Sequence, residues 1–131
     1  MKNIDCTLYC ITNSDGMSEE AFLSKVKGAC EGGVTLVQLR EKDRSTLSYY
    51  ELACKVKQIT DAYKIPLIID DRIDVAMAVG CGVHLGAEDM PISVARDIMG
   101  RDAVIGATAK TVEAAIKAEA DGADYIGSVS Y

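Results

Sequence analysis

Short runs of apolar residues, many of them β-branched, alternate along the chain with longer stretches in which apolar residues recur at helical spacing. This pattern predicts six strands separated by helices. Ser18 and Thr111 are suited to begin two of these helices, and Gly122 is suited to end the last one. The predicted strands cover residues 8–12, 34–40, 67–70, 82–85, 103–106 and 123–127.

Strands that alternate with helices over short connections are expected to run parallel, joined by right-handed crossovers. Two α/β architectures fit this order, an open doubly wound sheet and part of a barrel, and the pattern does not separate them. In both folds ligands bind beyond the carboxyl ends of the strands. With 49% hydrophobic content, residues 1–131 suffice for one core and are too few for two ordinary domains. We therefore expect a single domain.

Composition excludes several classes of protein. The net charge of -6 and the pI near 4.7 disfavour a nucleic-acid partner, because such proteins usually carry a basic patch. No apolar run approaches the roughly 20 residues that cross a bilayer, and the run after Met1 is too short for a secretory signal. Five cysteines without a CxxC pair, and one histidine, disfavour zinc and favour reduced core cysteines. We expect a cytoplasmic protein without a membrane partner.

The end of the second predicted strand carries an unusual polar group. In a strand alternate side chains share a face, so Gln38 and Arg40 point the same way and Lys42 follows one step beyond. Two cations and a neutral donor at a strand tip could hold an anion. The alternative is that residues 40–44 form only a solvated loop.

Two aspartates follow the next two predicted strands. Asp71 and Asp89 are the best metal candidates, and two carboxylates that leave room for waters and phosphate oxygens suit Mg²⁺. The alternative is that each caps the helix after it. Arg40 and Lys42 facing a bound Mg²⁺ make sense if an anion such as pyrophosphate lies between them.

Further polar residues lie within or just after apolar runs. His84, the single histidine, could be a hydrogen-bonded core residue or could orient a substrate at the mouth of the fold. The Thr108 hydroxyl could meet a phosphate oxygen or cap a helix. Gly86 and Gly106 could let a ligand approach the backbone or could merely relieve a turn.

Five segments, taken in order, closely resemble the thiamine phosphate synthase family. The resemblance runs from Leu8 to Gly127 and implies a TIM (β/α)8-type barrel, here incomplete with about six strand-helix units. It also implies a Mg²⁺-dependent transferase of thiamine biosynthesis, which joins a hydroxymethylpyrimidine diphosphate to a thiazole phosphate and releases pyrophosphate. The five segments are residues 38–42, 68–72, 82–86, 88–91 and 105–106.

The same resemblance implies a role for each matching residue. Asp71 and Asp89 would ligate Mg²⁺. Arg40 and Lys42 would be catalytic, because they would stabilise the charge that builds on the leaving group. The substrate-binding set would be Gln38, Leu39, Arg40, Glu41, Lys42, Asp70 and Thr108.

Three departures from the family pattern stand out. Asp70 occupies a position where the family usually has asparagine, and Lys110 one where histidine is common. Residues 127–131 enter the place of a Gly-Pro segment that precedes a phosphate-binding loop. A complete barrel needs eight units in roughly 200 residues or more, so the seventh and eighth strands, which supply the thiazole phosphate site, are absent here. We expect this chain either to form homo-oligomers through open strand edges or to be part of a longer protein.

Two other functions stay open. One is a thiazole tautomerase-like isomerase, which shares the barrel and lacks the diphosphate chemistry. The other is a non-catalytic truncated barrel that only binds a ligand or partner. The joint presence of Arg40, Lys42, Asp71 and Asp89 favours the transferase.

Overall fold

The computed structural model of the chain describes residues 4–128. Residues 1–3 and 129–131 lie outside this range. The expectation about a secretory signal after Met1 and part of the expected C-terminal departure from the family pattern concern these residues. The six predicted strands and the intervening helices are confirmed. In chain order they are β1 (Tyr9–Thr12), α1 (Glu19–Glu31), β2 (Leu36–Leu39), α2 (Thr46–Ala62), β3 (Leu67–Asp70), α3 (Ile73–Val79), β4 (Gly82–Leu85), α4 (Ile92–Met99), β5 (Ile105–Thr108), α5 (Val112–Asp121) and β6 (Tyr125–Gly127).

The fifth strand lies further along the chain than predicted. It begins at Ile105 and extends to Thr108, whereas the apolar pattern predicted residues 103–106. Ala103 lies outside the sheet, and its carbonyl oxygen accepts a 2.6 Å hydrogen bond from the guanidinium of Arg96 in α4. Pairing starts where Val83 lies opposite Ile105. As a result Thr108 is the last residue of β5, whereas the predicted strand ended two residues before it.

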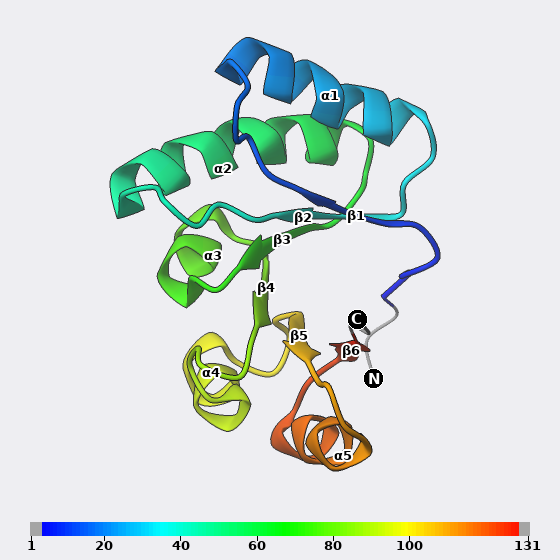
Figure 1. Ribbon diagram of the computed structural model, residues 1–131, viewed down its shortest axis with the longest axis vertical. Coiled ribbons are helices and arrows are strands. Elements are labelled where there is room, and N and C mark those ends of the chain that lie inside the picture. The colour runs from blue at the N-terminus through cyan, green and yellow to red at the C-terminus, as the bar shows by residue number, and fades with distance from the viewer. Residues whose placement is uncertain (1–3, 129–131) are drawn as a thin grey trace.

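All six strands are parallel, and each pairs with its neighbours in chain order. The strands follow an arc, and the five helices lie along its outer side (Figure 1). A doubly wound sheet would carry helices on both faces, whereas a barrel carries them only outside. The chain therefore adopts six strand units of a TIM-type barrel, which decides between the two architectures that the sequence left open.

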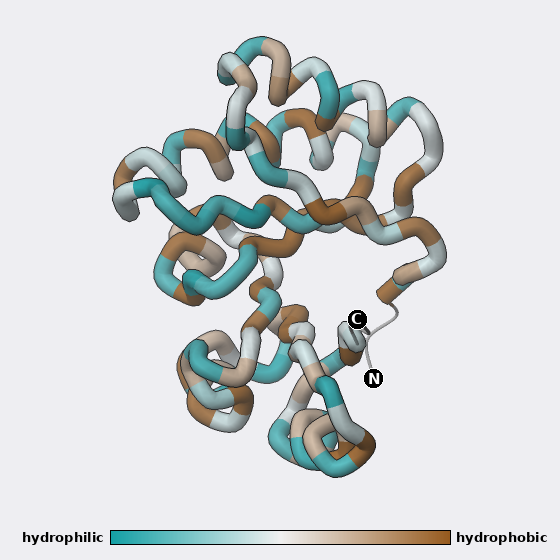
Figure 2. Tube along the Cα trace, in the orientation of Figure 1, coloured by the Kyte–Doolittle hydropathy of each residue, from teal (hydrophilic) through white to brown (hydrophobic). Residues whose placement is uncertain are grey.

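Alternate strand residues face the helices and form the core. Phe22, Leu52 and Val56 are helix residues that pack in this cluster. The strand residues of the cluster are Val37, Leu39, Leu67, Ile69, Val83, Leu85 and Ile105. Because side chains alternate along a strand, the positions between them face the inside of the arc. Hydrophilic stretches appear where the chain leaves β2 and β3 (Figure 2).

Local signals in the sequence account for the helix boundaries. The hydroxyls of Ser18 and Thr111 accept hydrogen bonds from backbone N–H groups in the first turns of α1 and α5. Gly122 follows α5 with a φ of 112°, a conformation that favours glycine. Among the described helices, none is both long and apolar enough to cross a bilayer.

Candidate functional site

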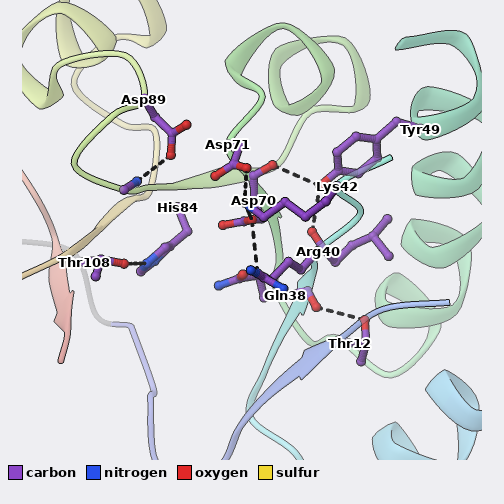
Figure 3. Close-up of polar contacts among 12 residues, drawn as sticks. Thr12, Gln38, Arg40, Lys42, Tyr49, Asp70, Asp71, His84, Asp89 and Thr108 are labelled. Carbon is purple, nitrogen blue, oxygen red and sulfur yellow. Dashed lines mark hydrogen bonds and ion pairs between the residues drawn. The ribbon is translucent and has the colours of Figure 1, made fainter. Parts of the chain in front are cut away.

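The polar side chains of the site come from four neighbouring strands. Gln38, Asp70, His84 and Thr108 occupy the strand positions that alternate with core residues, so they face the inside of the arc. Arg40, Lys42, Asp71 and Asp89 follow at the carboxyl ends of β2, β3 and β4. Figure 3 shows these side chains gathered at one end of the sheet. This is the end at which barrels and doubly wound sheets bind their ligands.

One cavity collects most of the predicted residues. It has a volume of about 640 Å³, and its lining includes Arg40, Lys42, Asp70, Asp71, Asp89 and Thr108. Lys110, which departs from the family pattern, also lines it. Gln38 lies in an adjoining cavity of about 650 Å³, which shares Arg40, Asp70 and Thr108 with the first. The structure therefore brings together residues that are far apart in the sequence.

Ion pairs join the cationic and acidic groups of this cavity. Lys42 Nζ lies 3.0 Å from Asp70 Oδ2 and donates a hydrogen bond to Asp71, while Arg40 Nε lies 3.6 Å from Asp70 Oδ2. Burial opposes the charge on Lys42, yet the neighbouring Asp71 and Asp70 carboxylates outweigh burial and raise its pKa. The Arg40 and Lys42 side chains are nearly half exposed, so these cations remain accessible to a ligand.

Asp70 is the most deeply buried acid of the site. Its Oδ2 forms ion pairs with Lys42 and Arg40, yet it is the one buried side-chain nitrogen or oxygen within residues 4–128 that has no hydrogen-bond partner. Burial raises the pKa of Asp70 more than Lys42 and Arg40 lower it. An acceptor held in this way can receive a hydrogen bond from a bound ligand.

Asp71 and Asp89 face each other across the cavity (Figure 3). Burial raises the pKa of Asp89, and the neighbouring Asp71 carboxyl raises it further. Burial also opposes ionisation of Asp71, but hydrogen bonds from Lys42 and Asp89 outweigh it and lower the pKa of Asp71. Asp71 has a φ of 71°, a left-handed conformation that aspartate tolerates better than most residues and that often marks functional positions.

The helix-capping alternative for these two aspartates is wrong. Arg72 and Pro91 occupy the N-cap positions of α3 and α4, and neither helix has a side-chain cap. Asp89 instead accepts a 2.7 Å hydrogen bond from the backbone N–H of Gly86, which orients its carboxylate. Within the described chain no group of three or more metal-ligating side chains could hold an ion. Two carboxylates suit Mg²⁺, which usually keeps several waters and phosphate oxygens.

Leu39 and Glu41 are placed away from the cavity. Leu39 packs in the core because it alternates with Gln38 along β2. The Glu41 carboxylate is buried between Arg44, 2.6 Å away, and Ser14, whose backbone N–H donates to it at 2.8 Å. Substrate binding by these two side chains, which the resemblance implied, therefore has no geometric support.

A hydrogen-bonded chain of side chains crosses the inside of the arc. Gln38 Nε2 donates to the Tyr9 hydroxyl at 2.8 Å, and the Tyr9 and Tyr125 hydroxyls are 2.5 Å apart. Tyr125 then meets His84 Nδ1 at 2.9 Å, and His84 Nε2 meets the Thr108 hydroxyl at 2.8 Å. His84 is thus a hydrogen-bonded interior residue, and Thr108 does not cap a helix. Neither tyrosine was predicted from the sequence to belong to the site.

Gly106 makes room for the Tyr125 ring. A Cβ atom at this position would lie 2.0 Å from Tyr125 Cζ. Tyr125 lies opposite Gly106 in the pairing of β5 with β6, so its ring folds over the glycine. Gly106 therefore admits an aromatic side chain of the protein, whereas the sequence suggested an approaching ligand or a relieved turn.

Tyr49 of α2 ties together the two strand ends that carry the site. Its buried hydroxyl lies 2.8 Å from the carbonyl oxygen of Leu39 and 3.0 Å from that of Asp70. These residues end β2 and β3, directly before Arg40 and Asp71. No motif marked this tyrosine, since a tyrosine in an apolar helix stripe predicts only packing.

We expect Tyr49→Phe to lower the free energy of unfolding by about 1–3 kcal/mol, because the buried carbonyl oxygens of Leu39 and Asp70 lose the hydroxyl that they share as a donor. The carbonyl oxygen of Asp70 keeps a second donor, the backbone N–H of Arg72. Urea denaturation followed by circular dichroism measures this difference. The matched control is Tyr50→Phe on the same helix, where the side chain is 39% exposed and the change should be small. Equal effects of the two substitutions would contradict the role of the Tyr49 hydroxyl in connecting the ends of β2 and β3.

Comparisons with known proteins agree with the fold and with the family that the sequence resembles. The profile of the family described as thiamine monophosphate synthase matches residues 8–130. Thiamine-phosphate synthase 2 of Streptococcus pneumoniae is 55% identical over 122 residues, which are 92% of this chain and 58% of that protein. Thiamine-phosphate synthase of Clostridium acetobutylicum is 51% identical over 128 residues, 97% of this chain and 61% of that protein.

A solved structure is similar over the same range. Thiamine phosphate pyrophosphorylase from Pyrococcus furiosus aligns with a TM-score of 0.85 and 42% sequence identity, over 94% of this chain and 59% of that chain. The chain spans about three fifths of the length of these relatives.

Proposed function

Because the chain belongs to the thiamine monophosphate synthase family, we propose that it supports a transferase reaction of thiamine biosynthesis. In this reaction a hydroxymethylpyrimidine diphosphate is joined to a thiazole phosphate, and pyrophosphate is released. The observation that carries the proposal is the meeting of Arg40 and Lys42 with Asp71 and Asp89 in one cavity at the carboxyl ends of the strands. An isomerase of the same fold binds no diphosphate, so it would not need these two cations and two carboxylates in one cavity.

The charges that line the cavity support a bound divalent cation. Its acidic residues are Asp70, Asp71, Glu88 and Asp89, and its basic residues are Arg40, Lys42 and Lys110. Because more carboxylates than cations line the cavity, its side chains alone do not attract a polyanion. Mg²⁺ held by Asp71 and Asp89 would supply the missing positive charge to the diphosphate oxygens.

In the proposed reaction the side chains act mainly on the leaving group. Arg40 and Lys42 donate hydrogen bonds to diphosphate oxygens as negative charge builds on them. The bond between the pyrimidine methylene carbon and the diphosphate oxygen breaks, and its electron pair leaves with pyrophosphate. The thiazole nitrogen then forms the new C–N bond with its lone pair. No protein nucleophile is required, because holding two substrates side by side supplies much of the acceleration.

The proposal is tested by supplying both substrates with Mg²⁺ and measuring thiamine phosphate by chromatography. Binding of inorganic pyrophosphate is measured separately by calorimetry, with and without Mg²⁺. We expect Mg²⁺-dependent binding of pyrophosphate. Binding that is equally tight after chelation of the metal would contradict the assignment of Asp71 and Asp89.

Self-association is a further prediction. Among the described strands, β1 and β6 each pair on one side only, because they lie at the two ends of the sheet. Unpaired strand edges favour association, and we propose that copies of this chain associate through them. Sedimentation velocity should show oligomers, and a stable monomer at all concentrations would contradict the prediction.

A further inference from the structure

The hydrogen-bonded chain inside the arc has five members from five different strands. It runs from Gln38 through Tyr9, Tyr125 and His84 to Thr108. Thr108 lines the cavity that contains Arg40, Lys42 and the two proposed metal ligands. The other four members line the adjoining cavity. The chain of contacts therefore ends at the proposed diphosphate site.

The first member favours one direction for the hydrogen bonds that follow, the one in which every hydroxyl both accepts and donates within the chain of contacts. The Gln38 amide nitrogen faces the Tyr9 oxygen, and an amide nitrogen only donates. Tyr9 accepts this bond, so its own proton is directed to Tyr125, its other partner in the chain. Tyr125 in turn directs its proton to His84 Nδ1. A neutral imidazole with an accepting Nδ1 carries its proton on Nε2.

The direction continues to the threonine. With a proton on Nε2, His84 donates to the Thr108 oxygen at 2.8 Å. The Thr108 hydroxyl proton is then turned away from His84 and is available to a ligand in the cavity that Thr108 lines. Reversal of the chain would turn this proton toward His84 and present the ligand with an oxygen lone pair.

We propose that Tyr9, Tyr125 and His84 are positioning residues that hold the Thr108 hydroxyl as a hydrogen-bond donor toward the anionic ligand. This inference rests on the proposed function, because it takes the ligand of the cavity to be a diphosphate. A donor stabilises an anion, whereas a lone pair at the same place would repel it.

The surroundings keep the members of the hydrogen-bonded chain uncharged, as the proposed direction requires. Burial lowers the pKa of His84, which keeps the imidazole neutral near pH 7. Burial also raises the pKa of Tyr9 and of Tyr125, so both hydroxyls keep their protons. The two tyrosine rings meet edge to face with centroids 5.6 Å apart, which limits their movement.

The direction can be read by NMR, because His84 is the only histidine in the sequence. In protein labelled with ¹⁵N-histidine, nitrogen shifts and couplings to the ring protons distinguish the two neutral tautomers. We expect the proton of His84 on Nε2 in the unmodified 131-residue chain. A proton on Nδ1 would overturn the proposal.

The substitution Gln38→Glu should reverse the chain. At alkaline pH the introduced carboxylate only accepts, so Tyr9 must donate to it, Tyr125 must donate to Tyr9, and His84 must donate from Nδ1. We expect the tautomer of His84 to change. The control is the same substitution in a protein that lacks one tyrosine hydroxyl, either Tyr9→Phe or Tyr125→Phe, whichever gives the better-dispersed spectrum. In this control Gln38→Glu should leave the tautomer of His84 unchanged. A Gln38→Glu protein that keeps the proton on Nε2, or a change that persists without the tyrosine hydroxyl, would overturn the relay.

A second measurement asks whether the chain acts through Thr108, with inorganic pyrophosphate and Mg²⁺ as the probe. Loss of a hydrogen bond to a charged group should make Thr108→Val bind pyrophosphate about tenfold or more weakly, and Thr108→Ser should restore binding. Tyr125→Phe alone should weaken pyrophosphate binding severalfold. In a protein that already carries Thr108→Val, it should have no further effect. Equal effects in both backgrounds would overturn the proposal. If the unmodified protein binds no pyrophosphate, the proposed function fails. The tautomer of His84 still shows the direction of the hydrogen-bonded chain in that case.

Discussion

Asp89→Asn should raise the Kd for inorganic pyrophosphate in the presence of Mg²⁺ by at least about 100-fold, since even outer partners of metal ligands are worth 10–100-fold. The substitution is nearly isosteric. The asparagine oxygen can still accept the hydrogen bond that Gly86 donates to Asp89, so the turn is kept. What is lost is the negative charge beside Asp71, and with it a large part of the proposed attraction for the cation.

Calorimetric titration with pyrophosphate, with and without Mg²⁺, measures this effect. The matched control is Asp74→Asn, which makes the same chemical change at an exposed ion pair with Arg72. This control should bind as the unmodified chain does. Without Mg²⁺ the Asp89→Asn protein and the unmodified chain should bind equally weakly. Undiminished Mg²⁺-dependent binding by Asp89→Asn would remove Asp89 from the proposed metal site.

Asp70→Asn should have the opposite effect and tighten the binding of pyrophosphate with Mg²⁺ about tenfold, equivalent to about 1.4 kcal/mol. The Asp70 carboxylate lies 3.0 Å from Lys42 Nζ and 3.6 Å from Arg40 Nε, so it competes with the ligand for both cations. Two unit charges 4 Å apart near a protein surface interact by about 4 kcal/mol. We expect less than this value because both cations are partly exposed to solvent.

The control for this substitution is Asp61→Asn. Asp61 forms an exposed ion pair with Lys57 on α2, so the change in net charge is the same while the site stays intact. Pyrophosphate affinity should not change in the control. Weaker binding by Asp70→Asn would mean that the Asp70 carboxylate assists the cation, and the competition argument would then be wrong.

Asp70→Asn should also change the pH dependence of stability. Burial raises the pKa of Asp70 in the folded state. The stability that such an acid contributes is present below its unfolded pKa and is lost as the pH rises through its folded pKa. The neutral amide avoids this loss, so we expect a higher Tm at neutral pH that converges with that of the unmodified chain on acidification. Thermal denaturation at several pH values measures the difference.

Strand-helix alternation was sufficient to predict the six strands and the site at their carboxyl ends. It was not sufficient to place the start of β5, because the apolar pattern does not show that the Ala103 carbonyl binds Arg96 and that pairing begins at Ile105. Neither the strand pattern nor the family motif that contains Glu41 revealed that its carboxylate contacts Arg44 and Ser14. Hydrophobic periodicity carries little information on such polar contacts, whether they join near neighbours such as Glu41 and Arg44 or distant residues such as Glu41 and Ser14.

The two interior tyrosines were missed for a related reason. Tyr9 and Tyr125 are 116 positions apart, and each is a common residue type in a strand. Only closure of the sheet into an arc brings their hydroxyls together. By contrast, Asp71 and Asp89 could be singled out from the sequence because carboxylates that follow apolar runs are uncommon and chemically specific.

The fit of the Tyr125 ring over Gly106 makes these two positions dependent on each other during evolution. A mutation that adds even one methyl group to the glycine must expel the ring, and the ring could return only after the glycine was restored. Related chains should therefore have a larger residue at the first position only together with a smaller one at the second. An alignment of relatives would show this as paired variation between two positions 19 residues apart.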